Sequence, residues 1–279
     1  MKIYRAGYVF GRSGWGEAGR DRTPSQESSY ALRFGPTRVG HGHNDHTAIT
    51  WHTLGRPILT DTGTGSYNQD AWRKHYLSPE AHNQLVVAGM RTATPTRLVR
   101  SAVGPKADFY QLADTPLRSV GRSRSVIVLS DPDVVLAVDR ASAPKATTFT
   151  QYWHLPHDVA LRASGTRATA TKAGVTTTLL QLPAAGEKAT TIGIVRGSTR
   201  PIQGWHWTDY FHRYPAPVAT VTQKGTSANV VTAIVASPGT RPVLVKTAIS
   251  GTTTTYTFTV GSRSGVVTLD AKGTLRRVR

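Results

Sequence analysis

Apolar and polar residues alternate in short stretches along most of this chain, and turn residues recur about every ten positions. Threonine and valine, whose branched side chains favour extended backbone, fill many of these stretches. Gly165 and Gly174 divide the longest stretch, and only residues 70–77 predict a helical turn. The pattern predicts strands at residues 47–54, 57–62, 84–88, 124–129, 134–138, 147–155, 159–182, 218–222, 228–237, 241–249, 253–260 and 265–269.

This succession of short strands without intervening helices predicts an all-β fold. Strands joined by tight turns pair antiparallel, and each sheet must bury its apolar face against another sheet. We therefore expect a large antiparallel β-sandwich of several sheets. No low-complexity linker and no convincing repeat divides the chain, so residues 1–279 are predicted to form one domain. The abrupt, strand-like N-terminus is typical of a fragment, or of the C-terminal part of a larger protein.

The composition limits the chemistry that the chain can support. It contains no cysteine, which excludes disulfide bonds and thiolate zinc sites, so a bound metal would need nitrogen and oxygen ligands. No apolar run at the N-terminus is long enough for a signal peptide, and none elsewhere approaches the roughly 20 residues of a membrane span.

The chain is strongly basic, with 34 lysine and arginine residues and a formal net charge of +18. Such a balance favours a polyanionic partner, which could be nucleic acid, an acidic polysaccharide or a membrane surface. A proteome-wide preference for arginine explains the charge equally well. The basic residues are scattered, and aromatic residues do not alternate with them as they do on a nucleic-acid stacking surface. Nucleic acid is therefore the weakest of these partners.

Histidine is concentrated in one part of the chain, because six of the ten histidines lie between His41 and His82. Residues 41–46 alone hold three imidazoles and a carboxylate. His43, Asp61 and His82 would provide two nitrogen ligands and one oxygen ligand, a set that suits Zn²⁺.

The spacing of these residues permits a metal site without requiring one. A simple hairpin through residues 55–56 pairs Asp61 with about Thr50, which places His43 about seven residues too far along a straight strand. The chain would have to fold back at Gly40 and Gly42. A structural, hydrogen-bonded histidine–aspartate pair explains the same residues without a metal.

Several segments taken together resemble the heparinase II/III-like domain, the C-terminal β-domain of polysaccharide lyases that act on heparin, heparan sulfate and alginate. The resemblance is strongest over residues 40–88. It rests on His-x-His-x-Asp at 41–45, Asp-x-Gly at 61–63 followed by Tyr67, Tyr76, Ala81-His82-Asn83, and more diffusely on Gly7-Tyr8, Arg12, Tyr152-Trp153-His154-Leu155 and Gly204-Trp205.

The resemblance implies roles for individual residues. His43, Asp61 and His82 match the zinc ligands of the family. His41 matches a position on the active-site face, and Tyr67 matches the tyrosine that serves as acid or base. Tyr76 remains a rival for that last role, because some relatives carry a longer insertion after the aspartate.

The resemblance also implies a reaction and partners. In the family, the sandwich packs against an N-terminal α/α toroid, and a uronate-containing glycan is cleaved between them by β-elimination. A tyrosine could serve in either proton step if positive neighbours or a metal lowered its pKa. The toroid does not precede this domain here, so we expect a separate partner or a longer parent chain to supply it. The alternative is a non-catalytic module that binds glycans or a partner protein, and either would act outside a bacterial cell, at its surface or in its periplasm.

The remaining marked residues are predicted to have mainly structural roles. Asp45 is expected in a turn or as a supporting carboxylate, His46 and His52 in a sheet, and Asn83 as the holder of a local turn. Trp153 and His154 are expected in a buried strand. Two sets remain open between sugar contact and a plainer role: Trp205, His206, Trp207 and Tyr210, and the pair Arg73 and Lys74.

Overall fold

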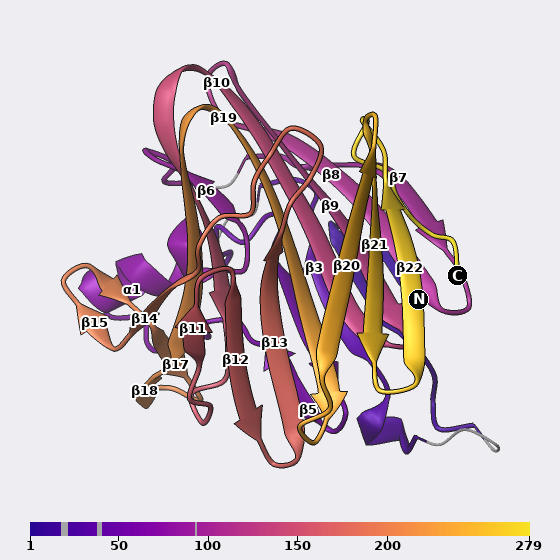
Figure 1. The fold of residues 1–279 in the computed structure, drawn as a ribbon. Helices are drawn as coiled ribbons and strands as arrows, with labels where there is room; N and C mark the ends of the chain where they lie inside the picture. The colour runs from indigo at the N-terminus through magenta and orange to yellow at the C-terminus, as the bar shows by residue number, and fades with distance from the viewer. Residues whose placement is uncertain (18–21, 38–40, 93) are drawn as a thin grey trace.

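The computed structural model describes residues 1–17, 22–37, 41–92 and 94–279. Within them the main architecture is a stack of three antiparallel sheets (Figure 1), which confirms the predicted all-β sandwich. Among the described residues, no helix is long and apolar enough to cross a membrane.

The N-terminal sheet contains the first five strands in chain order. They are β1 (Lys2–Tyr4), β2 (Tyr8–Arg12), β3 (Ser29–Arg33), β4 (Ile49–Thr53) and β5 (Arg56–Leu59).

The central sheet contains ten strands, of which eight follow the order β11-β12-β13-β19-β10-β9-β8-β7, while β14 pairs with β19 and β6 with β10. Its strands are β6 (Leu85–Val87), β7 (Arg97–Val103), β8 (Ala107–Leu117), β9 (Val120–Ser130), β10 (Asp133–His154), β11 (Arg162–Ser164), β12 (Arg167–Lys172), β13 (Val175–Leu182), β14 (Gly193–Arg196) and β19 (Pro217–Pro238).

The C-terminal sheet contains β20 (Val243–Ser250), β21 (Thr253–Val260), β22 (Arg263–Leu269) and β23 (Leu275–Arg277). Short elements gather at one end of the stack (Figure 1): α1 (Ala71–Tyr76), β15 (Ser198–Thr199), β16 (Ile202–Gln203), β17 (Trp205–Trp207) and β18 (Arg213–Pro215). Two 3-10 turns, Pro24–Gln26 and Pro79–Ala81, complete the elements.

The central strands are apolar on both faces because both faces are covered. On β9, Val126 and Val128 point into the core shared with the N-terminal sheet, whereas Ile127 and Leu129 point into the core shared with the C-terminal sheet. Successive side chains of a strand face opposite sides, so a strand buried on both sides has an almost continuous apolar sequence. The runs 126–129 and 134–138 have this character.

The structure joins strands that the pattern separates. Residues 134–138 and 147–154 belong to one long strand, β10, and residues 218–222 and 228–237 both belong to β19. The two long strands pair along their whole length, with a register shift between Ser142 and Thr147. Between these two segments, residues 142 and 144–146 are exposed, so the apolar pattern is interrupted within one strand.

Candidate metal centre and active site

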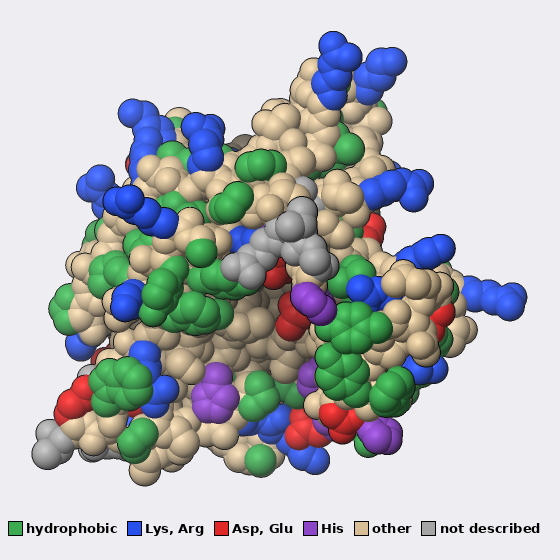
Figure 2. All heavy atoms as spheres, turned by 180° about the vertical axis from the view of Figure 1, so that it is seen from behind, with side chains coloured by type: hydrophobic (Ala, Val, Ile, Leu, Met, Phe, Trp, Pro, Cys, Tyr) green, Lys and Arg blue, Asp and Glu red, His purple; other side chains and the backbone are tan. Residues whose placement is uncertain are grey.

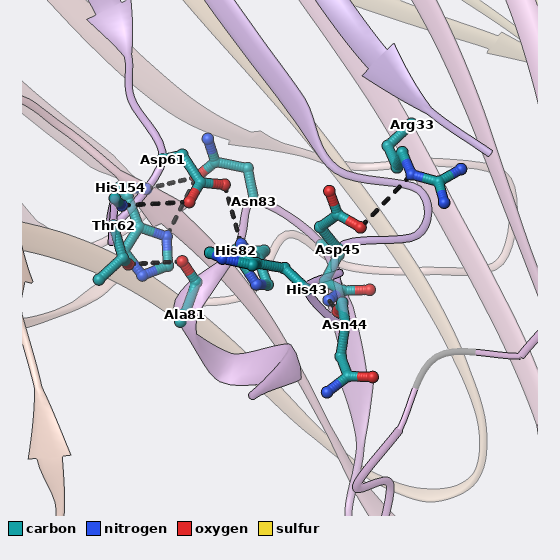
Figure 3. A network of polar contacts seen from close by, with 12 residues as sticks. Arg33, His43, Asn44, Asp45, Asp61, Thr62, Ala81, His82, Asn83 and His154 are labelled. Carbon is teal, nitrogen blue, oxygen red and sulfur yellow. Dashed lines mark hydrogen bonds and ion pairs between the residues drawn. The ribbon is translucent and has the colours of Figure 1, made fainter. Parts of the chain in front are cut away.

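The three predicted ligands lie close together (Figure 3). His43 lies in the loop before β4, Asp61 lies two residues after β5, and His82 follows the 3-10 turn Pro79–Ala81. One ligand atom from each of these residues lies within 4.8 Å of the other two. The structure therefore brings together three residues that are separated by 39 positions, 43 to 82, in the sequence.

The chain brings His43 back to Asp61 by reversing direction just before β4. The backbone of Ala48 donates a hydrogen bond to Asp45 O at 2.9 Å, and Thr47 adopts a left-handed φ of 75°. The expected reversal at glycine therefore occurs instead at a threonine; Gly40 lies outside the described residues. The loop is anchored by Asn44, whose side chain donates to Leu77 O at 2.6 Å, just beyond α1.

The Asp61 carboxylate gives the cluster its negative charge. His82 Nδ1 lies 2.8 Å from Asp61 Oδ2, and the Gly63 amide donates to Asp61 Oδ1 at 3.2 Å. Burial opposes the charge of Asp61, but the neighbouring imidazoles of His82 and His43 lower its pKa to about 2. Burial lowers the pKa of His43, with a further contribution from His82, so this imidazole is held neutral. Burial works against protonation of His82 too, yet the Asp61 carboxylate outweighs it and raises its pKa.

The donor set passes a direct test of fit to zinc. His82 is fully buried, and within the described part of the chain its Nε2 has no hydrogen-bond partner. A buried polar atom without a partner is costly unless a ligand satisfies it. Two imidazoles and one carboxylate are ligands that Zn²⁺ accepts, leaving a fourth position for water or substrate. The geometry also contains the histidine–aspartate hydrogen bond that a purely structural role would require.

Asn83 fixes the cluster to the sandwich rather than holding a local turn, so that prediction is wrong. Its Nδ2 donates to Ile49 O at 2.8 Å and Thr60 O at 2.7 Å, and its Oδ1 accepts from the backbone of His154 at 2.6 Å. Trp153 and His154 are buried in β10, as expected. One amide thus ties strand β4, the segment that carries Asp61, and β10 next to the ligand His82.

Sequence reasoning did not find the buried arginine beneath this site. Arg124 is fully buried and donates to both carboxylate oxygens of Asp139, at 2.7 and 2.6 Å. It also donates to Thr47 O at 3.0 Å and to Asn83 O at 2.5 Å. Its signal in the sequence is a charged residue just before the apolar run 126–129 of the same strand. Arg124 therefore connects the turn after His43 and the residue after His82 to the central sheet.

His41 and Tyr67, the two candidate catalytic residues, lie side by side at the surface of the site. His41 Nδ1 lies 2.6 Å from Tyr67 Oη, and the tyrosine side chain is 51% exposed. The guanidinium of Arg73 lies 5.0 Å from the centre of the Tyr67 ring. The hydrogen bond with Tyr210 nevertheless raises the pKa of Tyr67, with only partial opposition from Arg73. The pKa of Tyr67 is therefore shifted upward, opposite to the direction in which positive neighbours alone would shift it.

Tyr76 occupies a different environment from Tyr67. Its side chain is 1% exposed, and its hydroxyl donates to Ser66 O and accepts from Arg73 Nη1 at 3.0 Å. Its ring lies 6.0 Å from that of His43. Tyr76 thus supports the loop between the two candidate sites, whereas Tyr67 is the tyrosine that faces solvent.

An aromatic cluster packs behind the loop that carries Tyr67. Trp72 of α1 contacts Trp205 and Trp207 of β17 at ring-centroid distances of 5.2 and 5.8 Å. The guanidinium of Arg213 lies 3.8 Å from the centre of the Trp72 ring. Trp207 is buried, whereas Tyr210 is half exposed and stacks on Tyr67 at 6.2 Å. Most of the cluster therefore packs α1 against β17, and Tyr210 is its member next to the candidate active site.

The other marked residues have clear positions. Asp45 lies 3.6 Å from Arg33 in an ion pair and its carbonyl closes the turn, as expected. His52 lies in β4, whereas His46 lies in the turn with its Nδ1 2.6 Å from Thr94 O, so a sheet position for His46 is wrong. Arg73 donates to Ser66 O at 3.2 Å and is not simply solvated, unlike the exposed Lys74.

Gly63 gives a first prediction. Its φ is 84°, and a Cβ at this position would lie 2.5 Å from Trp207 O. We expect Gly63→Ala to destabilise the fold by about 1–3 kcal/mol, because the residue needs a left-handed conformation and has no space for a side chain. Urea unfolding measures the change. Gly174→Ala, whose Cβ would meet nothing within 4 Å, controls for the φ penalty alone; an equal loss in both variants would contradict the steric part.

Comparison with known proteins agrees with the geometry. Residues 20–241 match the family described as heparinase II/III-like, C-terminal. No curated protein matches the sequence. The fold is similar to that of heparan sulfate lyase HepC from Pedobacter heparinus, with a TM-score of 0.79 at 17% identity over 95% of this chain and 41% of that one. Heparinase III, the BT4657 gene product, gives a TM-score of 0.77 at 13% identity over 97% and 42%.

The matches to solved structures cover almost all of this chain but less than half of each relative. The chain spans about two fifths of the length of the two solved structures: the match covers 41% of one of those chains and 42% of the other. At these identities the likeness to solved structures shows the fold, while the match over residues 20–241 shows the family. The chain belongs to the heparinase II/III-like C-terminal domain family.

Proposed function

We propose that this chain is the β-domain of a polysaccharide lyase that cleaves a uronate-containing acidic glycan by β-elimination. The observation that carries the proposal is the His41–Tyr67 pair, with 2.6 Å between imidazole and phenol, beside the His43–Asp61–His82 cluster. Contacts connect the two: Arg73 lies over the rings of both Tyr67 and Tyr76, and Tyr76 lies beside His43. Acid, base and a candidate cation site thus share one surface.

The proton steps follow from the state of each group. His41 acts as the base and removes the C5 proton of the uronate through an imidazole nitrogen. The C5–H electrons form the C4–C5 double bond, and the C4–O4 bond breaks. Tyr67 donates its proton to the departing O4, because a tyrosine phenol is protonated at neutral pH, and the hydrogen bond with Tyr210 raises its pKa further. The acid and base are therefore adjacent side chains.

His43, Asp61 and His82 would hold zinc in this proposal. Bound there, the ion would supply positive charge near the substrate carboxylate and fix the three segments that carry its ligands. The chain itself contributes basic charge, with a net +18, which would attract an acidic glycan in a salt-dependent manner.

We further propose that a helical toroid, in a longer parent chain or in a separate partner, forms the opposite wall of the cleft. The solved relatives have lengths beyond the matched region that could accommodate such a domain. Action outside the bacterial cytoplasm is part of the same proposal. A non-catalytic glycan-binding module is the second candidate, and the exposed aromatic residues near the site favour it over a purely structural role.

Ultraviolet absorbance of the unsaturated uronate product tests the reaction. Heparin, heparan sulfate, alginate and hyaluronan are each supplied to the chain alone and to the chain mixed with a helical toroid domain, and we expect absorbance to rise with one of these glycans. Retained glycan binding without any rise in absorbance, with and without the toroid domain, would reject the lyase and support the binding module.

Metal content gives a second prediction. Protein purified without chelator should contain about one zinc per chain by elemental analysis, and His43→Ala should lose it. Chelator should lower the thermal stability of the wild type but not of the variant. His212→Ala is a matched control, because His212 forms an exposed pair with Asp209 at 2.5 Å. Absence of zinc, together with unchanged stability of His43→Ala, would reject the metal site.

A further inference from the structure

A groove on the outer face of the N-terminal sheet reaches the candidate site. Its volume is about 980 Å³, at the upper end of typical small-molecule pockets. Asp61 and Gly63 line one end, and Tyr4, Phe10 and Trp15 line the other. Figure 2 shows a hollow on this face of the molecule, with hydrophobic side chains gathered on both sides of it. The groove is thus continuous with the metal cluster but extends well beyond it.

The groove exists because small side chains occupy the middle of the sheet. Tyr30 and Leu32 of β3 point into the core, so the alternate residues Ser29 and Ala31 point outward. Ala31 pairs with Phe10 on one side and with Thr50 on the other. Across the sheet, the large Phe10 is therefore followed by the small residues Ala31 and Thr50. The small residues leave a hollow, and Phe10 stands at its side as part of a wall.

The wall combines exposed aromatic rings with cations. Tyr4, Phe10 and Trp15 are 41%, 48% and 73% exposed. Lys2 Nζ lies 5.0 Å from the centre of the Tyr4 ring, and the Arg12 guanidinium lies 4.6 Å from that of Trp15. An apolar ring surface beside a positive charge matches a ligand with apolar C–H faces and anionic substituents. Sugars with carboxylate or sulfate groups have this character.

The polar residues of the groove favour an acidic sugar chain over a protein domain as its ligand. Among the described lining residues, Asp61 is the one carboxylate, and it is paired with His82, whereas Lys2 and Arg12 are cationic. Ser29, Thr50 and His52 add hydrogen-bonding groups along the floor. A stable interface with a protein domain would favour an apolar, charge-depleted centre. The groove instead offers hydrogen bonds on the floor and positive charge at the wall.

We propose that this groove holds several consecutive units of an acidic polysaccharide, whose rings stack on Tyr4, Phe10 and Trp15 while Lys2 and Arg12 pair with its anionic groups. The inference rests on the proposed function, because it takes the glycan chain to extend from the candidate active site. It adds a binding region on β1, β2 and the loop after them, distant in sequence from residues 41–82.

Titration calorimetry with size-fractionated heparan sulfate and alginate oligosaccharides tests the groove. For the wild-type chain, affinity should increase from tetrasaccharide to decasaccharide with whichever glycan binds. The double variant Lys2→Ala/Phe10→Ala should lose roughly tenfold or more of its affinity for the decasaccharide and much less for the tetrasaccharide. Leu244→Ala/Lys246→Ala is the matched control, because it removes one exposed apolar side chain and one cation from β20.

A second variant keeps the test valid if the first does not fold. Trp15→Ala alters a side chain that is 73% exposed, and it should weaken decasaccharide binding and reduce the change in tryptophan fluorescence on binding. Decasaccharide affinity unchanged in both groove variants would overturn the inference and favour a protein partner on this face, even if cleavage is observed. Length-dependent binding that the groove variants abolish would support it, even if no cleavage is detected.

Discussion

Tyr67→Phe should lower kcat for glycan cleavage by about 10²–10⁴-fold while KM changes little, because the variant loses the proton donor for O4 and keeps the ring. The phenol lies 2.6 Å from His41 and is half exposed, so it can reach a substrate and its neighbouring base at once. Product absorbance measures both constants. His41→Ala should cause a loss of similar size.

Two further tyrosine variants separate catalysis from packing. Tyr76→Phe removes a buried hydroxyl that bonds to Ser66 O, so we expect reduced stability with kcat largely preserved. If Tyr76→Phe abolished turnover and Tyr67→Phe did not, the assignment of the acid would be wrong.

The pH dependence follows from the raised pKa of Tyr67. An acid must be protonated, so the raised pKa keeps Tyr67 active up to and above the ordinary tyrosine value of about 10. Tyr210→Phe removes the hydrogen bond that raises this pKa, so the alkaline decline in kcat should begin at lower pH in that variant. An alkaline limb that does not move would contradict the role of Tyr210.

Local pattern predicted the fold class well but missed several strands, among them β3, β7 and β8. Residues 253–260 are predicted as a strand and form β21 with identical bounds, because they alternate regularly and lie between two glycine-containing turns. The edge strand β7, residues 97–103, gives no such signal, because six of its seven side chains are exposed. Its position depends on backbone pairing with β8, which residue type alone does not reveal.

The sequence predicted the residues of the candidate site, but not the contacts that hold these residues in place. The family resemblance selected His43, Asp61 and His82, and the structure brings them together. The reversal at Thr47 was not predictable, since threonine rarely adopts a left-handed φ unless tertiary contacts impose it. Here the side chain of a distant strand, Arg124, binds the carbonyl of that residue. Such a contact depends on the packing of sheets and leaves no local pattern.

Arg124→Leu should destabilise the protein by about 3–5 kcal/mol, because it leaves the Asp139 carboxylate buried without its counter-ion. Arg124 and Asp139 are 0% and 1% exposed, and the remaining bond to Asp139 comes from Gln151 at 2.6 Å. Urea unfolding measures the loss. Lys106→Leu is the control, since its ion pair with Asp131 is exposed and should contribute at most about 1 kcal/mol.

The double variant Arg124→Leu/Asp139→Leu separates the core from the site. Removing both charges should recover much of the stability, because neither is then left buried alone. The carbonyls of Thr47 and Asn83 would still lack the donor that Arg124 provides, so the loops that carry His43 and His82 should remain loosened. We therefore expect weaker zinc binding in a double variant of near-normal stability. Full recovery of both properties would show that Arg124 stabilises only the core, and would remove it from the support of the site.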